Sequence, residues 1–384
     1  MKVFIIAGEV SGDKLGGAVM AGLRALVPDV QFDGVGGPLM QAQGLTSRFA
    51  MDELSLMGIA EILPKYFALK RRIRELAEAI VAWQPEVLLT IDSPDFCLRV
   101  AAEVHRLNAN ARVPRMVHYV APSVWAWRPK RAMKMARDID HVLALLPFEP
   151  PYMEAAGMEC DFVGHPVVAE PVATEEQAAA FRAKHGSDKA PLLLVLPGSR
   201  RGEVTRLADR FGETLRLFHA KNPTARAVLP MARPVAGLVR ELTADWAVKP
   251  ILLDPSDDPQ GLEKRAAFRA ADLALAASGT VSLELAANAT PMVIGYDMAW
   301  LSRQIISRLL RTDTVTLVNL VTDSRSVPEF IGENCVPADM AAALDRILAN
   351  PAEQIAAMAL TMERLGLDGE PPGLRAARAI LSRI

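Results

Sequence analysis

The sequence predicts an α/β protein built from two Rossmann-like lobes, each around a parallel sheet, that face a central cleft. Short apolar runs alternate with amphipathic stretches along almost all of the 384 residues, a pattern typical of βα units. That length suffices for two buried cores. The longest run without a charged side chain, 34–47, has fourteen residues and four glycines, whereas a membrane-spanning helix needs about 20 apolar residues.

Apolar runs of about three to six residues predict the strands and amphipathic stretches predict the helices. In the first lobe we expect strands at 3–7, 30–35, 87–91, 116–120 and 141–145, with helices between them at 14–26, 69–83, 96–107 and 129–136. The second lobe repeats the scheme, with strands expected at 192–196, 227–229, 251–253, 273–276 and 292–294. Gly164, Pro166 and Pro171 interrupt regular structure between the two series, so we expect lobes over 1–165 and 166–350 and helices over 351–384 that pack across them.

The composition argues against several classes of function. Lys plus Arg number 43 and Asp plus Glu 45, a net charge of −2, so no nucleic-acid partner is expected. The three cysteines form no CxxC pair, which argues against a disulfide framework or a structural zinc and fits a reducing cytosol. The six histidines lack a ligand spacing such as HExxH, so we predict no metal site. His118 and His165 lie near loop ends and either line the cleft or serve structural roles.

The loop after the first strand is rich in glycine. Ligands of open α/β sheets bind beyond the carboxyl ends of the strands, and residues 8–17 follow the first of them with Glu9, Ser11, Gly12 and Asp13. Such a turn lets backbone N–H groups approach an anion or a sugar. An ordinary tight βα turn explains the same residues.

Asp92 follows the apolar run 87–91 directly. An aspartate at the carboxyl end of a strand, in a partly dry cleft, is a candidate general base. A helix cap is the alternative, because Asp and Ser are common capping residues. We favour the general base for Asp92, since Pro94 holds it outside the helix, and the cap for Asp95.

Two loops of the second lobe suit a nucleotide diphosphate. Ser199 and Arg200 follow the strand at 192–196, and guanidinium groups give forked donors to phosphate oxygens; we expect Arg201 to be solvated instead. In the other loop, Ser278, Gly279 and Thr280 open a helix whose dipole favours phosphate, and Glu284 lies one turn further on, in reach of a ribose hydroxyl. Capping and dipole compensation are the alternatives.

Two basic stretches stand beside apolar residues in the first lobe. Residues 128–137 carry five cations, among them Arg128, Lys130 and Arg131, and follow Trp125 and Trp127. A second stretch, 70–74, follows a set of apolar residues that includes Ile59, Ile62, Leu63, Tyr66, Phe67 and Leu69. This combination suits an anionic membrane surface. A solvated helix face explains each stretch alone, but their presence in one lobe favours the lipid surface.

Together these segments resemble the lipid-A-disaccharide synthases, glycosyltransferases of lipopolysaccharide biosynthesis. The motifs occur in the family's order over nearly the whole chain, at 7–13, 35–38, 57–59, 91–96, 118–127, 146–149, 162–166, 196–200, 277–280 and 317–320. The run PSVWAW at 122–127 is long enough to be specific. One departure is Cys97, where the family often carries Asn.

The resemblance implies a GT-B fold without cofactor or metal. It implies transfer of 2,3-diacylglucosamine from UDP onto 2,3-diacylglucosamine 1-phosphate, giving a β-1,6-linked disaccharide and UDP, with Asp92 as the base. Glu284 and Asn319 would position the nucleotide, the 9–13 loop would face the acceptor sugar, and Arg128, Lys130 and Arg131 would receive its 1-phosphate.

The same resemblance places the protein in the cytoplasm of a Gram-negative bacterium, peripherally on the inner face of its inner membrane, where it could form a homodimer. Two other classes stay open. A UDP-N-acetylglucosamine 2-epimerase-like enzyme would have a similar fold but needs no lipid-facing surface. A non-catalytic module for a nucleotide or lipid would need no aspartate beside the cleft.

Overall fold

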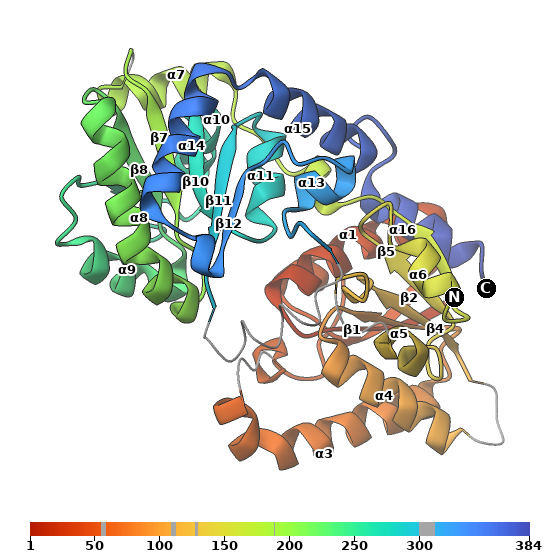
Figure 1. The fold of residues 1–384 in the computed structure, drawn as a ribbon. Helices are drawn as coiled ribbons and strands as arrows, with labels where there is room; N and C mark the ends of the chain where they lie inside the picture. The colour runs from red at the N-terminus through yellow and green to blue at the C-terminus, as the bar shows by residue number, and fades with distance from the viewer. Residues whose placement is uncertain (55–58, 109–112, 127–129, 188, 299–311) are drawn as a thin grey trace. The chain divides into compact units, whose positions relative to one another are not determined.

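The structure is a computed structural model that describes residues 1–54, 59–108, 113–126, 130–187, 189–298 and 312–384, with the side chains of 59–66 outside the description (Figure 1). The chain divides into two compact units. Unit 1 comprises Met1–Ala169 and Leu365–Ile384, and unit 2 comprises Glu170–Arg364. The division after Ala169 lies four residues beyond the expected boundary, and of the expected C-terminal segment 351–384 the part up to Arg364 belongs to unit 2 and Leu365–Ile384 to unit 1.

Unit 1 has a six-stranded parallel sheet in the order β2-β1-β3-β4-β5-β6. Its strands are β1 (Lys2–Ala7), β2 (Gln31–Val35), β3 (Val87–Ile91), β4 (Arg115–Tyr119), β5 (His141–Ala144) and β6 (Glu159–Phe162). Its helices are α1 (Val10–Leu26), α2 (Pro38–Ala42), α3 (Ile59–Trp83), α4 (Pro94–Leu107), α5 (Lys130–Met135), α6 (Pro150–Glu154) and α16 (Pro372–Leu381), with 3-10 turns η1 (Met51–Glu53) and η2 (Pro166–Ala169). The central strand β3 is buried along its whole length and mostly apolar, because helices cover both faces of such a sheet.

Unit 2 repeats the arrangement with the order β12-β11-β10-β7-β8-β9. Its strands are β7 (Leu192–Leu196), β8 (Arg226–Pro230), β9 (Ile251–Leu253), β10 (Leu273–Ala277), β11 (Met292–Tyr296) and β12 (Glu329–Ile331). Its described helices are α7 (Glu175–Lys184), α8 (Arg201–Lys221), α9 (Ala236–Thr243), α10 (Leu262–Ala270), α11 (Val281–Ala287), α13 (Leu317–Thr322), α14 (Pro337–Ala349) and α15 (Ala352–Arg364), with 3-10 turns η3 (Arg233–Val235) and η4 (Gly332–Asn334).

Each predicted strand is present within one or two residues, and the two-sheet α/β fold is confirmed. The edge strands β6 and β12 were not predicted, because their sequences are short and only partly apolar. Helix α3 begins at Ile59, ten residues before the predicted start, and α1 begins at Val10 rather than Lys14. None of the helices in the described part of the chain is long and apolar enough to cross a bilayer.

In each sheet, the order in which the chain adds strands reverses at one internal point. In unit 1 the chain moves from β1 outward to β2 and then resumes on the other side of β1 with β3; in unit 2 it does the same from β7, with β8 on one side and β10 on the other. Loops after the two strands at such a point diverge and leave a crevice for a ligand. The relevant loops follow β1 and β3 in unit 1, and β7 and β10 in unit 2.

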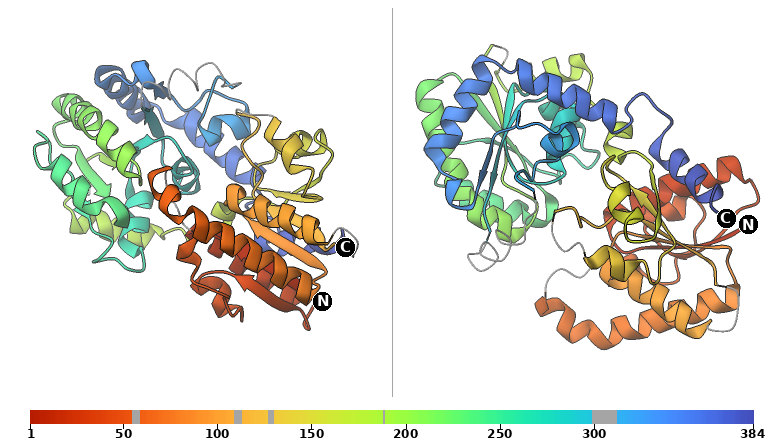
Figure 2. Two further views of the ribbon diagram at one scale, coloured as in Figure 1. Left: turned by 90° about the horizontal axis from the view of Figure 1, so that it is seen from below. Right: turned by 45° about the vertical axis from the view of Figure 1, so that its right-hand side comes forward.

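The returning helix α16 packs along α1 through two glycines (Figures 1 and 2). A methyl group built on Gly22 would lie 2.6 Å from the Gly373 carbonyl oxygen, and one on Gly373 would lie 2.6 Å from the Ala18 carbonyl oxygen. Backbone atoms cannot retreat as a flexible side chain can, so both positions require glycine. This contact fixes the end of the chain onto unit 1.

Replacing Gly22 with Ala should therefore lower the free energy of unfolding by about 1–3 kcal/mol, the usual cost of overpacking. The matched control is Gly237→Ala in α9, where an added methyl meets nothing within 4 Å. That substitution should be neutral or stabilise by up to about 1 kcal/mol, because alanine favours helix. Urea unfolding of both variants measures the difference, and equal effects would contradict the glycine contact.

Candidate active site

Asp92 lies at the carboxyl end of β3, outside helix α4, as predicted. It and Ser93 both adopt left-handed backbone conformations, with φ of 50° and 41°, before Pro94 starts the helix. The Asp92 amide donates to the Tyr119 carbonyl oxygen at 3.0 Å, which ties the turn to the end of β4. Two consecutive left-handed residues that are not glycine cost on the order of 1–2 kcal/mol each. The turn is therefore strained, and this strain accompanies the placement of the Asp92 carboxylate at the edge of the sheet.

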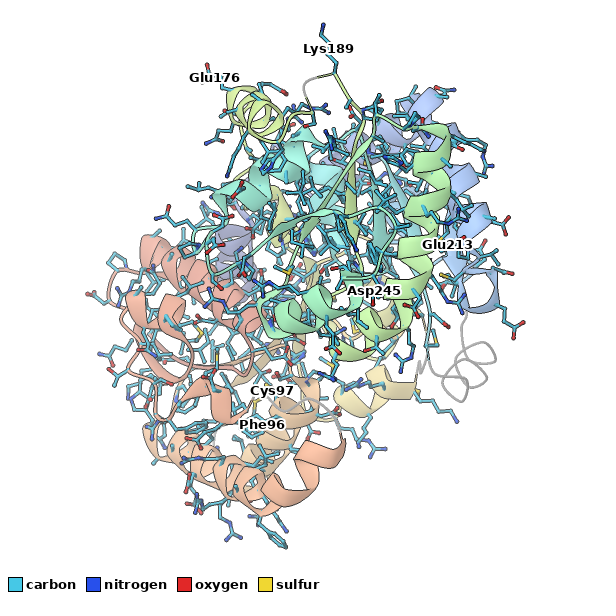
Figure 3. The ribbon with its side chains drawn as sticks, turned by 90° about the vertical axis from the view of Figure 1, so that its left-hand side faces the viewer. Phe96, Cys97, Glu176, Lys189, Glu213 and Asp245 are labelled. Carbon is cyan, nitrogen blue, oxygen red and sulfur yellow. The ribbon has the colours of Figure 1, made fainter. Side chains whose placement is uncertain are left out.

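The Asp92 carboxylate forms no hydrogen bond or ion pair with any residue that the structure describes. It is half-buried and lines a pocket. Cys97 follows Phe96 at the start of α4 and is buried (Figure 3). Burial, and then the nearby charge of Asp92, raise the pKa of the Cys97 thiol, which therefore stays neutral. A free carboxylate near a neutral thiol can accept a proton from a bound hydroxyl.

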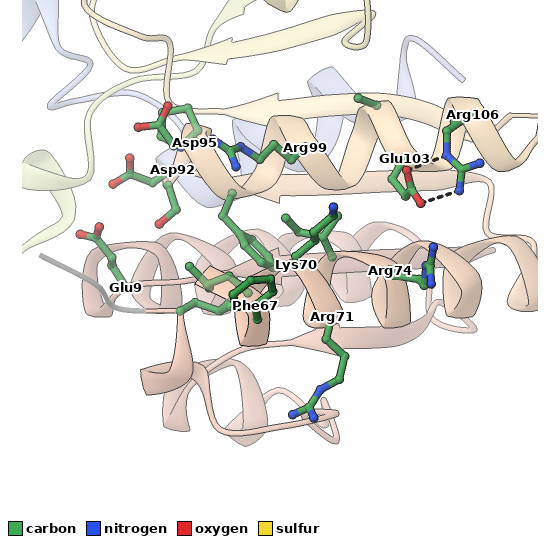
Figure 4. Close-up of a pocket in the computed structure, with 17 residues that line it drawn as sticks. Glu9, Phe67, Lys70, Arg71, Arg74, Asp92, Asp95, Arg99, Glu103 and Arg106 are labelled. Atoms are coloured by element: carbon green, nitrogen blue, oxygen red, sulfur yellow. Dashed lines mark hydrogen bonds and ion pairs between the residues drawn. The ribbon is translucent and has the colours of Figure 1, made fainter. Parts of the chain in front are cut away.

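The pocket beside Asp92 has a volume of about 980 Å³ and lies between α3 and α4 (Figure 4). Glu9, Asp92 and Asp95 stand at one end (Figure 4). The remaining lining combines apolar with basic side chains: Leu54, Phe67, Leu69, Ile73, Phe96 and Ala102 with Lys70, Arg71, Arg74, Arg99 and Arg106. Ser93, Pro94 and Glu103 complete it. An apolar pocket with acids at one end and bases along its length suits an amphipathic anion.

The loop after β1 is shorter than predicted, because α1 already begins at Val10. Glu9 precedes the helix, makes no capping bond with its side chain, and lines the pocket. Ser11 is exposed in the first turn, whereas Gly12 is buried. A methyl on Gly12 would stand 3.3 Å from the Ala7 side chain. Of the predicted acceptor-facing residues in this loop, Glu9 is the one that reaches the pocket.

Asp13 serves a structural purpose rather than the predicted contact with the acceptor sugar. Its buried carboxylate accepts hydrogen bonds from the backbone N–H groups of Gly37, Leu39 and Met40 at 2.9–3.0 Å. These are the unpaired donors at the start of α2, so Asp13 caps that helix from a distance in sequence. Both carboxylate oxygens accept these bonds and Asp13 is 3% exposed, an environment that sequence spacing could not reveal.

The basic stretch after the PSVWAW motif contributes one contact at the acidic end of the pocket. Arg131 pairs with the exposed Asp95, at 3.2 Å between Nη2 and Oδ1. Asp95 therefore makes an ion pair and does not cap α4, whose N-terminus shows no side-chain cap. Lys130 is exposed to solvent. Arg128 lies outside the described residues.

Of the predicted membrane-facing residues, two have described side chains. Phe67 is 81% exposed, as a lipid-facing residue would be. Leu69 is half-buried and packs against the core of unit 1. The other four, Ile59, Ile62, Leu63 and Tyr66, belong to α3, but their side chains lie outside the description.

The sequence alone assigned no role to Glu149, which is buried after β5. Glu149 accepts hydrogen bonds from the Leu145 and Leu146 amides and from the Trp125 indole, at 3.0–3.4 Å. Burial nevertheless raises the pKa of Glu149 to about 7. Because Trp125 also meets the Phe148 ring edge-on at 5.2 Å, this carboxyl helps to hold Trp125 near the end of β5.

His118 is a structural residue at the end of β4. Its Nδ1 lies 2.8 Å from the Thr90 hydroxyl, and Thr90 also donates to the Val117 carbonyl oxygen at 3.2 Å. Burial, with a smaller contribution from Arg131, lowers the pKa of His118 to about 4. His165 is likewise buried, and its Nδ1 accepts from the Val167 amide at 3.1 Å. The structural alternative therefore holds for both histidines in the part of the chain described.

The lowered pKa of His118 predicts a loss of stability in acid. The unfolded chain binds this proton near pH 6.5 and the folded protein only near pH 4, so stability falls as the pH drops between these values. From pH 7 to pH 5, the free energy of unfolding of the wild type should fall by about 2 kcal/mol more than that of the His118→Gln variant. Glutamine keeps a polar group for Thr90 but does not titrate. Urea titrations at both pH values measure this, and parallel losses would refute it.

The loop after β7 is already occupied by a carboxylate. Gly198, with φ of 113°, turns the chain so that Ser199 and Arg200 stand exposed before α8. Glu203 from the first turn of α8 accepts from both of their amides, at 3.3 and 3.4 Å, and from the Arg200 guanidinium at 3.1 Å. The Ser199 and Arg200 donors that were predicted to bind a diphosphate thus all bind the Glu203 carboxylate in this structure. Arg201 is exposed, as expected.

The loop after β10 presents Ser278, Gly279 and Thr280 before α11, with Gly279 and Thr280 exposed. Ser282, not Thr280, makes the local side-chain bond, donating to the Gly279 carbonyl oxygen at 2.9 Å. Glu284 pairs with Lys264 of α10 at 2.8 Å on a half-exposed surface. A ribose hydroxyl would have to share the Glu284 carboxylate with this lysine.

Asn319 holds its own loop together. It is fully buried, its amide nitrogen donates to Thr314 and to the Val327 carbonyl oxygen, and its amide oxygen accepts from the Val327 amide. Both amide hydrogens are used, so the predicted contact with the nucleotide has no donor left on this side chain. We assign it to support of the segment between α13 and β12.

Sequence reasoning missed the face of α4 that forms one wall of the pocket. Asp95, Arg99, Ala102 and Arg106 all line it. They are spaced by four, three and four residues, which places them on one side of a helix. That spacing was a usable signal, but a solvated helix face shows the same pattern. Among the described residues, no cluster of three or more His, Cys, Asp or Glu could hold a metal.

Two six-stranded parallel sheets with polar loops at their switch points define a GT-B-type fold, and solved structures share it. UDP-GlcNAc 2-epimerase from Neisseria meningitidis, bound to UDP-GlcNAc, aligns with a TM-score of 0.64 at 12% identity and covers 100% of this chain and 99% of its own. The Methanocaldococcus jannaschii UDP-GlcNAc 2-epimerase gives 0.61 at 13% identity, with the same coverage. At such identities the likeness concerns the fold alone.

The sequence narrows this class to one family. Residues 3–372 match the family model described as lipid-A-disaccharide synthetase. Lipid-A-disaccharide synthase from Ruegeria pomeroyi is 62% identical over 387 residues, covering 100% of this chain and 96% of the relative. Lipid-A-disaccharide synthase from Rhodospirillum centenum is 46% identical over 387 residues, covering 100% of this chain and 94% of the relative. The chain belongs to the lipid-A-disaccharide synthase family of UDP-sugar glycosyltransferases, which serve lipid A and lipopolysaccharide biosynthesis, as the sequence motifs implied.

Proposed function

We propose that this protein transfers 2,3-diacylglucosamine from UDP to the 6-hydroxyl of 2,3-diacylglucosamine 1-phosphate, with inversion at the anomeric carbon. Family membership supports the formation of the lipid A disaccharide. The observation that carries the mechanism is the free Asp92 carboxylate at the end of an apolar pocket. A general base beside a lipid-sized cavity is what a hydroxyl acceptor with acyl chains requires.

In the proposed reaction, Asp92 takes the proton of the acceptor's 6-hydroxyl as that oxygen attacks the anomeric carbon. The bond from this carbon to the β-phosphate oxygen breaks at the same time, and UDP leaves with the electron pair. A single displacement from the opposite face inverts the centre and yields the β-1,6 linkage. Asp92 suits the base role because it has no competing hydrogen bond among the described residues and lies near a neutral Cys97.

Stabilisation of the leaving diphosphate falls to the loops of unit 2. Fixed donors directed at developing charge are a large contribution to catalysis. Ser199 and Arg200 already gather around the Glu203 carboxylate, which shows that this loop accommodates negative charge. We infer that the diphosphate replaces Glu203 there and that the exposed loop at Ser278–Thr280 adds further donors.

The apolar part of the pocket suits the acyl chains of the acceptor. Leu54, Phe67, Leu69, Ile73 and Phe96 line it within reach of the acidic end at Asp92. Each methylene removed from water contributes about 0.8 kcal/mol. A soluble sugar would gain nothing from such a wall, so the pocket favours the lipid acceptor over an epimerase substrate.

Asp92→Asn should lower kcat by at least about 100-fold with UDP binding unchanged, because the amide cannot take the proton. The assay mixes protein, UDP-diacylglucosamine and the acylated 1-phosphate acceptor, and follows UDP and disaccharide. Asp95→Asn is the matched control, since Asp95 is 96% exposed and pairs with Arg131. Normal turnover in the Asp92 variant would remove it from the role, and UDP release without acceptor would sink the transferase assignment.

We further propose that unit 1 works on the inner face of the inner membrane. Phe67 on α3 is 81% exposed and Met133 on α5 is 66% exposed, and the exposed Lys130 and Lys134 flank the latter. Exposed apolar side chains beside lysines combine burial in hydrocarbon with attraction to anionic headgroups.

Phe67→Ser should weaken binding to phosphatidylglycerol-containing vesicles about tenfold, since burying one phenylalanine contributes about 1.5–3 kcal/mol. Leu262→Ser in unit 2, where Leu262 is 51% exposed, is the control and should bind like the wild type. Vesicle flotation measures the bound fraction. Equal flotation of the two variants would contradict a membrane role for α3.

A further inference from the structure

The basic side chains that line the pocket between α3 and α4 differ in how they are neutralised. Arg106 is held by Glu103 through two bonds of 2.7 and 2.8 Å. Arg71 lies 3.5 Å from Glu75 and points away from α4 (Figure 4). Lys70, Arg74 and Arg99 form no hydrogen bond or ion pair with any described residue. Three unneutralised cations therefore face one pocket.

The single acid among these cations does not balance them. Glu103 is bonded to Arg106, and its pKa is lowered first by that bond and further by the charges of Arg74 and Lys70. One carboxylate thus faces three positive groups from two helices. The other acids of the pocket, Glu9, Asp92 and Asp95, stand at its far end (Figure 4). Charge in the pocket is separated along its length, with positive charge in excess away from Asp92.

Arg99 occupies the position between the two ends. It lies five residues into α4 from Pro94, which corresponds to roughly 7 Å of helix axis. Its guanidinium extends back toward Asp92 and Asp95 (Figure 4). A sugar with one hydroxyl at Asp92 would therefore have the Arg99 guanidinium beside it, in the same pocket, and could present another substituent to it.

We propose that Arg99, supported by Lys70 and Arg74, binds the phosphomonoester of the acylated acceptor and so determines its selectivity for a phosphorylated sugar. A guanidinium matches phosphate oxygens with paired donors, and the apolar residues beside it, Phe67, Leu69 and Ile73, receive the acyl chains. The proposal rests on the proposed function. It differs from the sequence-based expectation, which gave the 1-phosphate to Arg128, Lys130 and Arg131.

The test compares two acceptors, 2,3-diacylglucosamine 1-phosphate and its dephosphorylated form, in mixed detergent micelles with UDP-diacylglucosamine. The wild type should prefer the phosphorylated acceptor in kcat/KM. Arg99→Gln should reduce this preference by about 10- to 100-fold, because a hydrogen bond between charged groups is lost. The loss should appear in KM for the phosphorylated acceptor, while turnover of the dephosphorylated one and KM for the donor stay unchanged.

Arg71→Gln is the matched control and should keep the wild-type preference. Lys70→Gln should reduce it, by less than Arg99→Gln. The proposal is overturned if Arg99→Gln keeps the wild-type preference, if the preference is lost in Arg131→Gln instead, or if the wild type does not distinguish the two acceptors. If kcat/KM of Arg99→Gln falls equally with both acceptors, that result would also count against a phosphate contact. Failure of the wild type to form any disaccharide would instead refute the proposed function.

Discussion

The pairing of β1 with β3 is the constraint on which the candidate site depends. The parallel register sets Ala7 opposite Ile91, so the loops that begin at Gly8 and Asp92 leave the sheet side by side. A methyl group on Gly8 would stand 2.9 Å from the Ser93 hydroxyl, which shows how closely the two turns approach. Because β2 lies on the other side of β1, the paths of the two loops diverge and open the sheet edge to a ligand.

The rigid surroundings of Asp92 explain how a strained turn persists. Asp92 and Ser93 are both left-handed, and Val120, with φ of 85°, adds a third unusual conformation at the end of β4. Such geometries survive only where the neighbouring structure determines them fully. Here the Asp92 amide donates to the Tyr119 carbonyl oxygen, and the buried side chains of Thr90 and His118 bond between β3 and β4. The Glu149 carboxylate accepts from the Leu146 amide after β5. The strain of the turn at Asp92 is thus balanced by the hydrogen bonds and packing of the sheet around it.

The candidate site was predictable wherever a residue's position along a strand decided its role. Asp92 directly follows an apolar strand, and the Ser199 and Ser278 loops follow theirs, so all of them must lie at a carboxyl edge. The predictions that changed depended on which backbone groups the polar side chain meets in the folded chain, near or far in sequence. Asp13 caps α2 across twenty-four residues, and Asn319 bonds within its own loop. Polar residue types are the same in a cap and in a binding site, so spacing alone does not separate these roles.

The sequence by itself determined the two parallel sheets, the family and the place of Asp92, because period, apolar runs and motif order are local properties of the chain. Only the tertiary structure decided which cations remain without partners. Arg71, Arg99 and Arg106 look alike in sequence, yet one pairs with Glu75, one with Glu103 and one with no described residue. Each pair lies within one helix, and Glu103 stands four residues after Arg99 as well as three residues before Arg106. Sequence spacing therefore allows Glu103 to pair with either arginine, and only the side-chain positions in the folded protein decide that it pairs with Arg106.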